Sequence, residues 1–418
     1  MIEEMRAISP VADSPEFRER VRGVFVKHGF RVEHRGATDS ILIVRLDALG
    51  DMVLTSGVIR EIRRNYPNAF ITLLVQKNVF PLVELCPYVN EVIALEVPKM
   101  SAFSEGLYYA VLDFCNKRLW RRRYSICFCP QWGDARANTY RIAFLSGAEK
   151  IIGFNVVGNV IYNKLTRKVE TGSDESMNGY MTEVVFTPDD MVREAERHFH
   201  LLTGAGLRVR DMSMEAWFSK AELENVRSMI GGRATGKVIV ALGIGASIPC
   251  RRYPVSQYVE AMKMLLSRNV FFLILGGNDV ADDVVMIEKA IPAESMMSLV
   301  NKTTIRETEA AISISDIYVG NNTSLSHIAA ALKVPVITPI QEAKDREEIM
   351  PGYISLYARF SPWQTRSRVL RPEHGIDECS DPQNFMYGGC GHHNESHCIA
   401  QIRPEQIVEA FDELMKEQ

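Results

Sequence analysis

The first carboxylates that could do chemistry follow a short apolar stretch. Residues 41–44 form a continuous apolar run, which is typical of a strand buried on both faces of a parallel sheet. Gly50 interrupts the pattern, and from Asp51 onward apolar residues recur at helical spacing. Asp51 is therefore expected at or near a helix N-cap, where free N–H groups and the helix dipole favour a carboxylate. Open α/β sheets bind ligands at this edge, so Asp51 is either a cap alone or part of a site that also takes in Arg45 and Asp47.

A second candidate site begins with a loop rich in small residues. Residues 242–254 read Leu-Gly-Ile-Gly-Ala-Ser-Ile-Pro-Cys-Arg-Arg-Tyr-Pro. Small residues let backbone N–H groups approach an anion, Ser247 offers a hydroxyl, and Arg251 and Arg252 supply positive charge. This combination suits a diphosphate, although a loose glycine-rich pattern is weak evidence when it stands alone.

Two further loops are expected at the same sheet edge. Gly276 and Gly277 follow a predicted strand, where they would either admit a nucleotide or simply form a tight turn. The run from residue 319 to 327 then enters a predicted helix, with Asn322, Thr323 and Ser324 at the free amides of its N-terminus, a position that suits phosphate. His327 lies one turn later, and it could reach the same phosphates or be a packed, hydrogen-bonded histidine.

The chain has eight cysteines, and three of them lie in a segment rich in Gly and Asn. Cys379, Cys390 and Cys398 accompany three histidines there, a composition that could hold zinc or iron as a structural metal. Their spacings are not those of a zinc finger or ribbon, so the metal site is one alternative and plain thiols the other. Four other cysteines lie on apolar elements and are expected in the core: Cys86, Cys115, Cys127 and Cys129.

The elements that must position these residues alternate between strand and helix. This pattern predicts βαβ units with parallel sheets, and it occurs in two successive series. The fold class is therefore α/β, with two Rossmann-like domains that face each other across a cleft. We expect an N-terminal extension, an acceptor-side domain, a nucleotide-binding domain and a C-terminal helix that packs back at the domain junction, with these bounds: 1–38, 39–205, 206–403 and 404–418. Residues 155–188 are expected to form a long surface loop that could grip a substrate.

Composition excludes several classes of protein. Apolar residues make up 46% and charged residues 24% of the 418 residues, as in an ordinary globular protein. The net charge of −4 indicates no nucleic-acid surface. The acidic start of the chain lacks the apolar core of a signal peptide, and no apolar run approaches the roughly 20 residues that span a bilayer. We therefore expect a cytoplasmic protein with at most peripheral contact at the inner face of the membrane.

Together, these segments resemble glycosyltransferase family 9, the ADP-heptose:lipopolysaccharide heptosyltransferases and their relatives. The resemblance extends from about residue 40 to 415 and rests on four pieces in matching order: residues 44–55, 251–254, 275–277 and 320–331. It implies an inverting enzyme with the GT-B fold that needs no cofactor for catalysis. It also implies Asp51 as general base toward the acceptor hydroxyl, and binding of the nucleotide sugar by Arg251, Asn322, Thr323, Ser324 and His327. The residues themselves add Arg45 and Asp47 as acceptor-side candidates, and Ser247, Gly276 and Gly277 as further candidates for binding the nucleotide sugar.

This sequence departs from the family pattern at two positions. Asn322 stands where the family has an aspartate, and Ser324 where it has a glycine. An amide cannot act as a charged acceptor for sugar hydroxyls, so the donor sugar could differ from ADP-heptose. The predicted function is transfer of a sugar, heptose by resemblance, to a lipopolysaccharide-type or other glycan, a lipid-linked glycan or a protein. The alternatives are a sugar-nucleotide epimerase and a catalytically silent nucleotide-sugar-binding protein, and a homo-oligomer is compatible with any of them.

Overall fold

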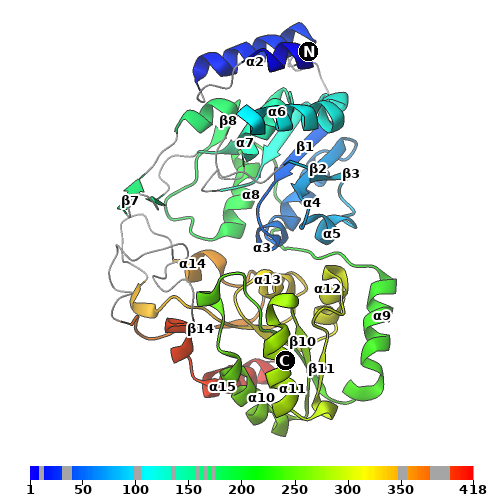
Figure 1. Ribbon diagram of the computed structural model, residues 1–418, viewed down its shortest axis with the longest axis vertical. Coiled ribbons are helices and arrows are strands. Elements are labelled where there is room, and N and C mark those ends of the chain that lie inside the picture. Colours follow the sequence, from blue (N-terminus) through cyan, green and yellow to red (C-terminus); the bar gives the residue numbers. More distant parts are fainter. Residues whose placement is uncertain are drawn as a thin grey trace. The chain divides into compact units, whose positions relative to one another are not determined.

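The computed structural model describes ten segments of the chain: residues 1–8, 14–30, 40–97, 105–132, 138–155, 160–163, 168–171, 175–346, 355–376 and 396–417. The chain divides into two compact units, residues 1–161 with 171–212, and residues 162–170 with 213–418. The main division thus follows Met212, seven residues after the expected boundary at 205. Within the described part of the chain, each unit contains a parallel six-stranded sheet flanked by helices (Figure 1). The predicted α/β class and Rossmann-like architecture are confirmed.

The sheet of the first unit has β1 (Ser40–Arg45) near its centre. Its order is β3-β2-β1-β4-β5-β8, and every neighbouring pair is parallel. All six residues of β1 are buried, as the apolar run predicted. The other strands are β2 (Phe70–Gln76), β3 (Glu91–Leu95), β4 (Ile126–Cys129), β5 (Lys150–Phe154) and β8 (Glu183–Val185).

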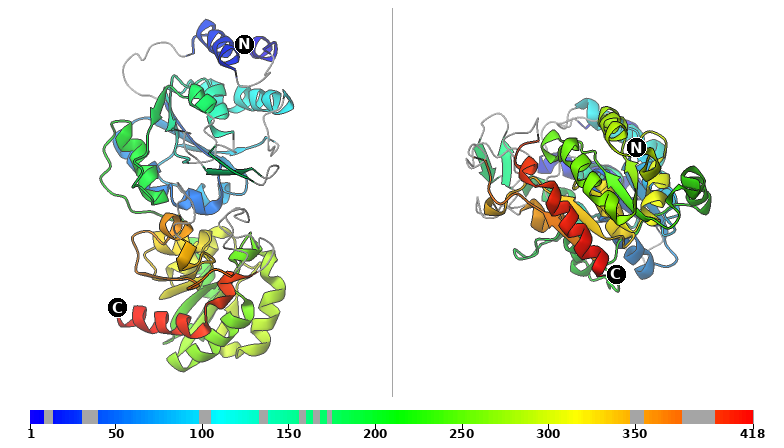
Figure 2. Two further views of the ribbon diagram at one scale, coloured as in Figure 1. Left: turned by 90° about the vertical axis from the view of Figure 1, so that its left-hand side faces the viewer. Right: turned by 90° about the horizontal axis from the view of Figure 1, so that it is seen from below.

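The helices of the first unit include two at the start of the chain that were expected to be an extension. Met5, Phe17, Val21 and Phe25 of this segment are buried in the main hydrophobic cluster of the unit, so the segment is part of its core. Figure 2 shows these helices in blue from a further side. The α-helices are α1 (Ile2–Arg6), α2 (Pro15–Lys27), α3 (Leu49–Val53), α4 (Ser56–Asn65), α5 (Phe80–Val83), α6 (Glu105–Phe114), α7 (Thr139–Leu145) and α8 (Glu194–Gly204).

The stretch 155–188, expected to be a surface loop, contains regular structure. β8 adds a sixth strand to the first sheet, and β6 (Val160–Asn163) pairs with β7 (Lys168–Thr171) in a separate two-stranded sheet. These strands have only three or four residues, too few to show a clear hydrophobic period. The loop prediction for this stretch was therefore partly wrong.

The second unit repeats the strand order of the first. Its sheet runs β11-β10-β9-β12-β13-β14, so the first strand again lies between the second and the fourth. The strands are β9 (Val238–Gly243), β10 (Val270–Leu275), β11 (Met296–Ser298), β12 (Ile317–Gly320), β13 (Val336–Pro339) and β14 (Ser367–Leu370). The helices are α9 (Lys220–Ile230), α10 (Val255–Leu265), α11 (Ala281–Ala290), α12 (Ile305–Ser313), α13 (Ser324–Ala331), α14 (Leu356–Phe360) and α15 (Pro404–Lys416).

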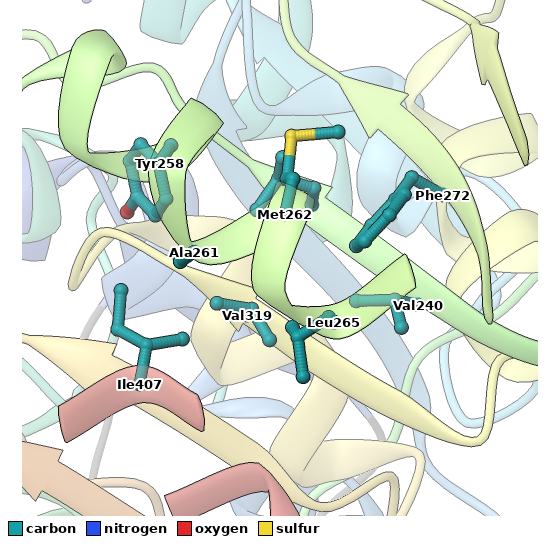
Figure 3. Close-up of a pocket in the computed structure, with 9 residues that line it drawn as sticks. Val240, Tyr258, Ala261, Met262, Leu265, Phe272, Val319 and Ile407 are labelled. Atoms are coloured by element: carbon teal, nitrogen blue, oxygen red, sulfur yellow. The ribbon is translucent and has the colours of Figure 1, made fainter. Parts of the chain in front are cut away.

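The C-terminal helix α15, expected at the domain junction, packs against α10, β13 and β14 of its own unit. Ile407 of α15 closes one side of a small apolar cavity between α10 and the sheet (Figure 3). Side chains from β9, β10 and α10, among them Val240, Phe272 and Met262, line the rest of it. A lining of this kind, without charged groups, marks a gap in core packing and not a ligand site.

No helix in the described part of the chain has both the length and the apolar character needed to cross a membrane.

Candidate functional site

The first cluster of polar residues lies where β1 and β4 end. These neighbouring strands are the point at which the strand order reverses, and such switch points open the ligand-binding crevice of doubly wound sheets. Arg45 is the last residue of β1, and Pro130 and Gln131 follow β4 directly. The Arg45 guanidinium donates through Nη1 to the Pro130 carbonyl oxygen, which ties the two strand ends together.

Arg45 is a buried cation between two carboxylates. Its side chain is 1% exposed, with Nε 3.3 Å from Asp47 Oδ2 and Nη2 3.6 Å from Asp51 Oδ1. The structure thus brings together all three residues predicted for this site. Because the Arg45 guanidinium is desolvated, its interactions with the two carboxylates differ from surface ion pairs, which contribute little to stability. It supplies a fixed positive charge to both carboxylates.

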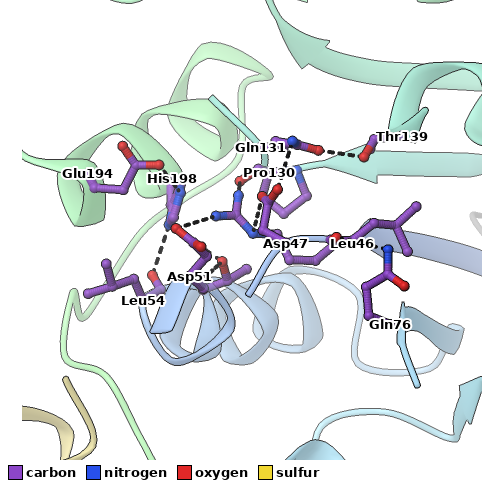
Figure 4. Close-up of polar contacts among 12 residues, drawn as sticks. Leu46, Asp47, Asp51, Leu54, Gln76, Pro130, Gln131, Thr139, Glu194 and His198 are labelled. Atoms are coloured by element: carbon purple, nitrogen blue, oxygen red, sulfur yellow. Dashed lines mark hydrogen bonds and ion pairs between the residues drawn. The ribbon is translucent and has the colours of Figure 1, made fainter. Parts of the chain in front are cut away.

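The two carboxylates have different surroundings (Figure 4). Asp47 Oδ1 accepts a hydrogen bond of 2.9 Å from Gln131 Nε2, and the Thr139 hydroxyl in turn donates to Gln131 Oε1. Burial raises the pKa of Asp47, and the Arg45 charge opposes this rise. Asp51 has 28% of its side chain exposed, the largest value among the three charged residues. Asp51 is therefore slightly more exposed than Asp47, whose side chain is 23% exposed.

Asp51 lies near the helix N-cap and not at it. α3 begins at Leu49 with Ala48 as its N-cap, which puts Asp51 in the first helical turn. A carboxylate in the first turn is still favoured by the helix dipole, so the physical argument holds while the boundary was two residues late. The Thr55 hydroxyl donates to the Asp51 carbonyl oxygen at 2.8 Å, just beyond the end of the helix.

Sequence reasoning missed two buried residues beside this cluster. His198 and Glu194 on α8 have side chains 0% and 1% exposed, and His198 Nε2 lies 3.1 Å from Glu194 Oε1. The other ring nitrogen, Nδ1, lies 3.0 Å from the Leu54 carbonyl oxygen. The spacing Glu-x-x-x-His places both side chains on one helix face, and this was the only signal that could have found them.

In the second unit, the polar cluster lies at the corresponding switch point between β9 and β12. Asn321, which directly follows β12, is fully buried and connects the two strand-end loops. Its Nδ2 donates to the carbonyl oxygen of Ile244 at 2.7 Å, and its Oδ1 accepts from the Tyr253 N–H at 2.9 Å. Gly320 allows this close approach, since a Cβ there would overlap the Gly243 carbonyl oxygen. Sequence reasoning named the adjacent Asn322 and missed Asn321.

The two arginines predicted for the diphosphate have different roles in the structure. Arg252 donates to the carbonyl oxygens of Ala246 and Asp279, and its Nη2 lies 2.8 Å from Asp279 Oδ2. It therefore holds the loop in shape. Arg251 ends a short 3-10 turn and is partly exposed, and Ser247 earlier in the loop is exposed.

The two glycines after β10, Gly276 and Gly277, also have different surroundings. A Cβ at Gly276 would lie 2.5 Å from Val280 Cγ2, so packing against the following turn requires a glycine there. Gly277 is exposed, and a Cβ there would meet only Asp279 Oδ1, at 3.3 Å. The close-approach role predicted for both glycines therefore fits Gly277 better than Gly276.

The helix start predicted for the phosphate site is that of α13, with Thr323 as the N-cap and Ser324 as the first helical residue. The Thr323 N–H already donates to Ser326 Oγ at 3.2 Å, so the helix itself uses one of the amides that we assigned to phosphate. Asn322 donates through Nδ2 to the Phe360 carbonyl oxygen of α14 at 3.3 Å. His327 is 6% exposed, which agrees with the packed alternative.

The metal prediction lies largely outside the described residues, because Cys379 and Cys390 are not among them. Cys398 is described, and it is buried beside Cys250 with its Sγ 3.6 Å from His397 Nδ1. In the described segments, no three or more residues with metal-binding side chains come together. The described residues therefore do not make up a metal site, and we assign no step of the chemistry to a metal. The cysteines predicted in the core, Cys86, Cys115, Cys127 and Cys129, are buried.

Comparison with known proteins fits this geometry. Residues 163–343, which include the loops at β9, β10 and β12, match the model of glycosyltransferase family 9 (heptosyltransferase). The resemblance to glycosyltransferase family 9 is confirmed. The enzyme class predicted from the sequence, a glycosyltransferase, is confirmed with it.

Solved structures support the fold over nearly the whole chain. A family 9 glycosyl transferase from Veillonella parvula has 15% identity and a TM-score of 0.69, covering 92% of this chain and 99% of that one. The ADP-heptose LPS heptosyltransferase II of E. coli has 17% identity and a TM-score of 0.65, covering 90% and 99%. E. coli heptosyltransferase WaaC, solved with ADP-2-deoxy-2-fluoro heptose, has 13% identity and a TM-score of 0.59 over the same shares. The fold is therefore GT-B. A search of curated proteins gave no match.

Proposed function

We propose that this chain is an inverting glycosyltransferase that transfers a sugar from a nucleotide-diphosphate sugar to a hydroxyl of an acceptor, with Asp51 as the general base. The observation that carries the proposal is the family 9 match over residues 163–343, a range that contains the loops suited to a diphosphate. The geometry of the first unit supports the base, because the partly exposed Asp51 carboxylate lies beside the buried Arg45 cation at a switch point.

The donor that we propose is an ADP-heptose-like sugar nucleotide. Two similar solved structures carry ADP or ADP-2-deoxy-2-fluoro heptose. In this chain, Arg251, Ser247 and the N-terminus of α13 would bind the diphosphate, and Gly277 would lie against the nucleoside. Asn322 and Ser324 differ from the family pattern, so titration with a panel of sugar nucleotides is the test of which sugar the donor carries. The acceptor is a lipopolysaccharide-type or other glycan, a lipid-linked glycan or a protein hydroxyl.

The proposed reaction is a direct displacement. The acceptor oxygen attacks the anomeric carbon while an Asp51 oxygen takes its proton, and the bond from the anomeric carbon to the diphosphate breaks. A positioned base of this kind contributes typically about 10²- to 10⁴-fold. Arg251 and the amides at the start of α13 stabilise the negative charge on the departing nucleoside diphosphate. The Arg45 charge opposes the rise that burial causes in the pKa of Asp47.

The test combines titration calorimetry with a turnover assay. We expect the protein to bind ADP and to release ADP from ADP-heptose when an acceptor is supplied. Asp51→Asn should abolish this release while ADP binding remains. Turnover retained in Asp51→Asn would remove Asp51 from the base role. Binding without turnover in the unmodified protein, across donors and acceptors, would instead indicate a silent binding protein.

A further inference from the structure

The buried Glu194–His198 pair on α8 has no part in the mechanism above, yet it contacts the helix that carries Asp51. Both side chains are almost completely removed from solvent. Burying two ionisable groups is costly unless each finds a strong partner. A buried pair of this kind is therefore expected to have a structural or functional role, and its hydrogen-bond partners indicate which part of the fold it stabilises.

The contacts of His198 fix where its protons are. Nδ1 faces the Leu54 carbonyl oxygen, which can only accept, so Nδ1 must carry a hydrogen. Nε2 faces Glu194 Oε1, and a single proton shared between these two atoms satisfies both. The pair is then either imidazolium with carboxylate or neutral imidazole with carboxylic acid. In both states it has no net charge, and in both states Nδ1 donates to Leu54.

Leu54 is the C-cap of α3, directly after the last helical residue, Val53. α3 has only five residues, too few for a helix to be stable by itself, so contacts from outside the helix must set its orientation. The Leu54 carbonyl oxygen is held by His198, and the Asp51 carbonyl oxygen by the Thr55 hydroxyl. Thr55 Oγ1 in turn lies 3.5 Å from His198 Nδ1. Figure 4 shows Glu194 and His198 beside Asp51. The histidine thus contacts two adjacent residues just beyond the C-terminal end of α3, and one of them, Thr55, holds the Asp51 carbonyl oxygen.

We infer that His198 is a positioning residue: held by Glu194, it anchors the C-terminal end of α3 and thereby fixes the direction of the Asp51 carboxylate. This inference rests on the proposed function, because it takes Asp51 as the base. His198 does not touch the substrate in this scheme. Its effect is on how often Asp51 is correctly placed when the acceptor is bound.

Two substitutions of His198 separate its two hydrogen bonds. The amide nitrogen of Asn occupies the place of histidine Nδ1, so His198→Asn keeps a donor for Leu54 and loses the contact with Glu194. The amide nitrogen of Gln occupies the place of Nε2, so His198→Gln keeps the contact with Glu194 and loses the one with Leu54. We expect His198→Gln to lower kcat by roughly 10²-fold with KM for the donor little changed, as for a misplaced catalytic group. His198→Asn should restore much of that loss.

Glu194→Gln is the matched control. Its amide can donate to Nε2 of a neutral imidazole, so the ring and its bond to Leu54 stay in place. We expect this variant to stay close to the original in kcat and in the pH profile of kcat. Equal losses of kcat in His198→Asn and His198→Gln, or an unchanged kcat in His198→Gln, would overturn the anchoring role. A shifted pH profile in Glu194→Gln would replace it with an electrostatic one.

Hydrogen exchange tests the anchor without reference to activity. Amide exchange over residues 49–55 should be faster in His198→Gln than in His198→Asn at comparable melting temperatures. The same exchange in both variants contradicts the anchor, whatever the enzyme does. If Asp51→Asn retains turnover, by contrast, the base assignment fails even where the exchange difference is found. The two failures are therefore distinguishable.

Discussion

At the scale of single residues, Arg45 contacts two carboxylates, Asp47 and Asp51, whose surroundings differ. Asp47 is tied to both Arg45 and Gln131, and burial raises its pKa. Asp51 has the looser contact with Arg45 and the greater exposure. A general base needs an oxygen that can reach the substrate, whereas a carboxylate that holds a guanidinium and an amide contributes more to the shape of the site. These surroundings favour Asp51 for chemistry and Asp47 for support.

The first prediction compares these two carboxylates. Asp47→Asn keeps an oxygen that can accept from Gln131 and removes one charge beside Arg45. We expect kcat to fall less in Asp47→Asn than in Asp51→Asn, because the loss of a base costs about 10²- to 10⁴-fold. Turnover of both variants under the same donor and acceptor concentrations measures the difference. The reverse order of the two losses would make Asp47 the base.

A second residue-scale prediction concerns Glu309 on α12, which is fully buried. Burial raises its pKa from 4.5 to about 9, with partial opposition from Arg306. Between these values the folded protein keeps a proton that the unfolded chain has lost, so the free energy of unfolding falls as the pH rises through this window. Glu309→Gln removes this titration. Urea unfolding at pH values from about 5 to about 9 should therefore show a growing advantage of the variant over the original protein. A constant difference would mean that Glu309 titrates normally.

The residues of the site were partly predictable. Arg45, Asp47 and Asp51 follow from their place after an apolar strand, because strand ends in a parallel sheet share an edge. His198 lies far along the chain from them, and its role depends on a packing contact that no local pattern encodes. The choice between Asn321 and Asn322 depends on which of two neighbouring amides points inward, and the sequence pattern does not distinguish them.

At the scale of elements, Asn321 holds the loop after β9 in place. Besides the Ile244 and Tyr253 bonds, its Nδ2 lies 3.3 Å from the Gly245 carbonyl oxygen, and its Oδ1 accepts from the Tyr258 hydroxyl at 3.0 Å. The C-terminal segment supports the same loop from another side, because Ser396 Oγ donates to the Arg252 carbonyl oxygen and Tyr253 Oη donates to that of Ile402. The shape of the proposed diphosphate loop thus depends on residues distant in the sequence.

The third prediction uses two adjacent asparagines. Asn321→Asp replaces a buried donor by a carboxylate that faces carbonyl oxygens, a change that costs about 1–3 kcal/mol or more. We expect a lower urea midpoint and weaker ADP binding by calorimetry. Asn322→Asp is the matched control for the urea midpoint, since it loses only the 3.3 Å bond to Phe360 at a partly exposed position. Similar losses in both variants would contradict the special role of Asn321.

Three strands of the two large sheets that the sequence pattern did not predict share a physical property. β8 and β11 have three residues and β14 has four, and all three lie at sheet edges. Short edge strands take their structure from backbone pairing with a neighbour and not from a run of apolar side chains. The central strands β1, β9 and β10 have long apolar runs and were found. The long-range pairing that forms the edges is not encoded locally.

At the scale of the whole molecule, the two units share a strand order and the way in which the central strand ends are held together. Each has the strand order third-second-first-fourth-fifth-sixth, and each holds its central switch point with a buried polar side chain, Arg45 in the first unit and Asn321 in the second. The carboxylates belong to the first unit and the loops suited to a nucleotide to the second. In the proposed function, chemistry and donor binding are therefore assigned to different units.

The fourth prediction follows from this division. Arg251→Ala removes a charge proposed to bind the diphosphate, so ADP affinity should fall by roughly tenfold or more. Asp51→Asn lies in the other unit, and it should leave ADP affinity unchanged while turnover is lost. If the two residues contribute to ADP binding independently, the double variant should bind ADP as Arg251→Ala does. Calorimetric titration of ADP into the four proteins measures all of these affinities. Weaker ADP binding in Asp51→Asn alone would show that the first unit takes part in holding the nucleotide, and the assignment of donor binding to the second unit would then be wrong.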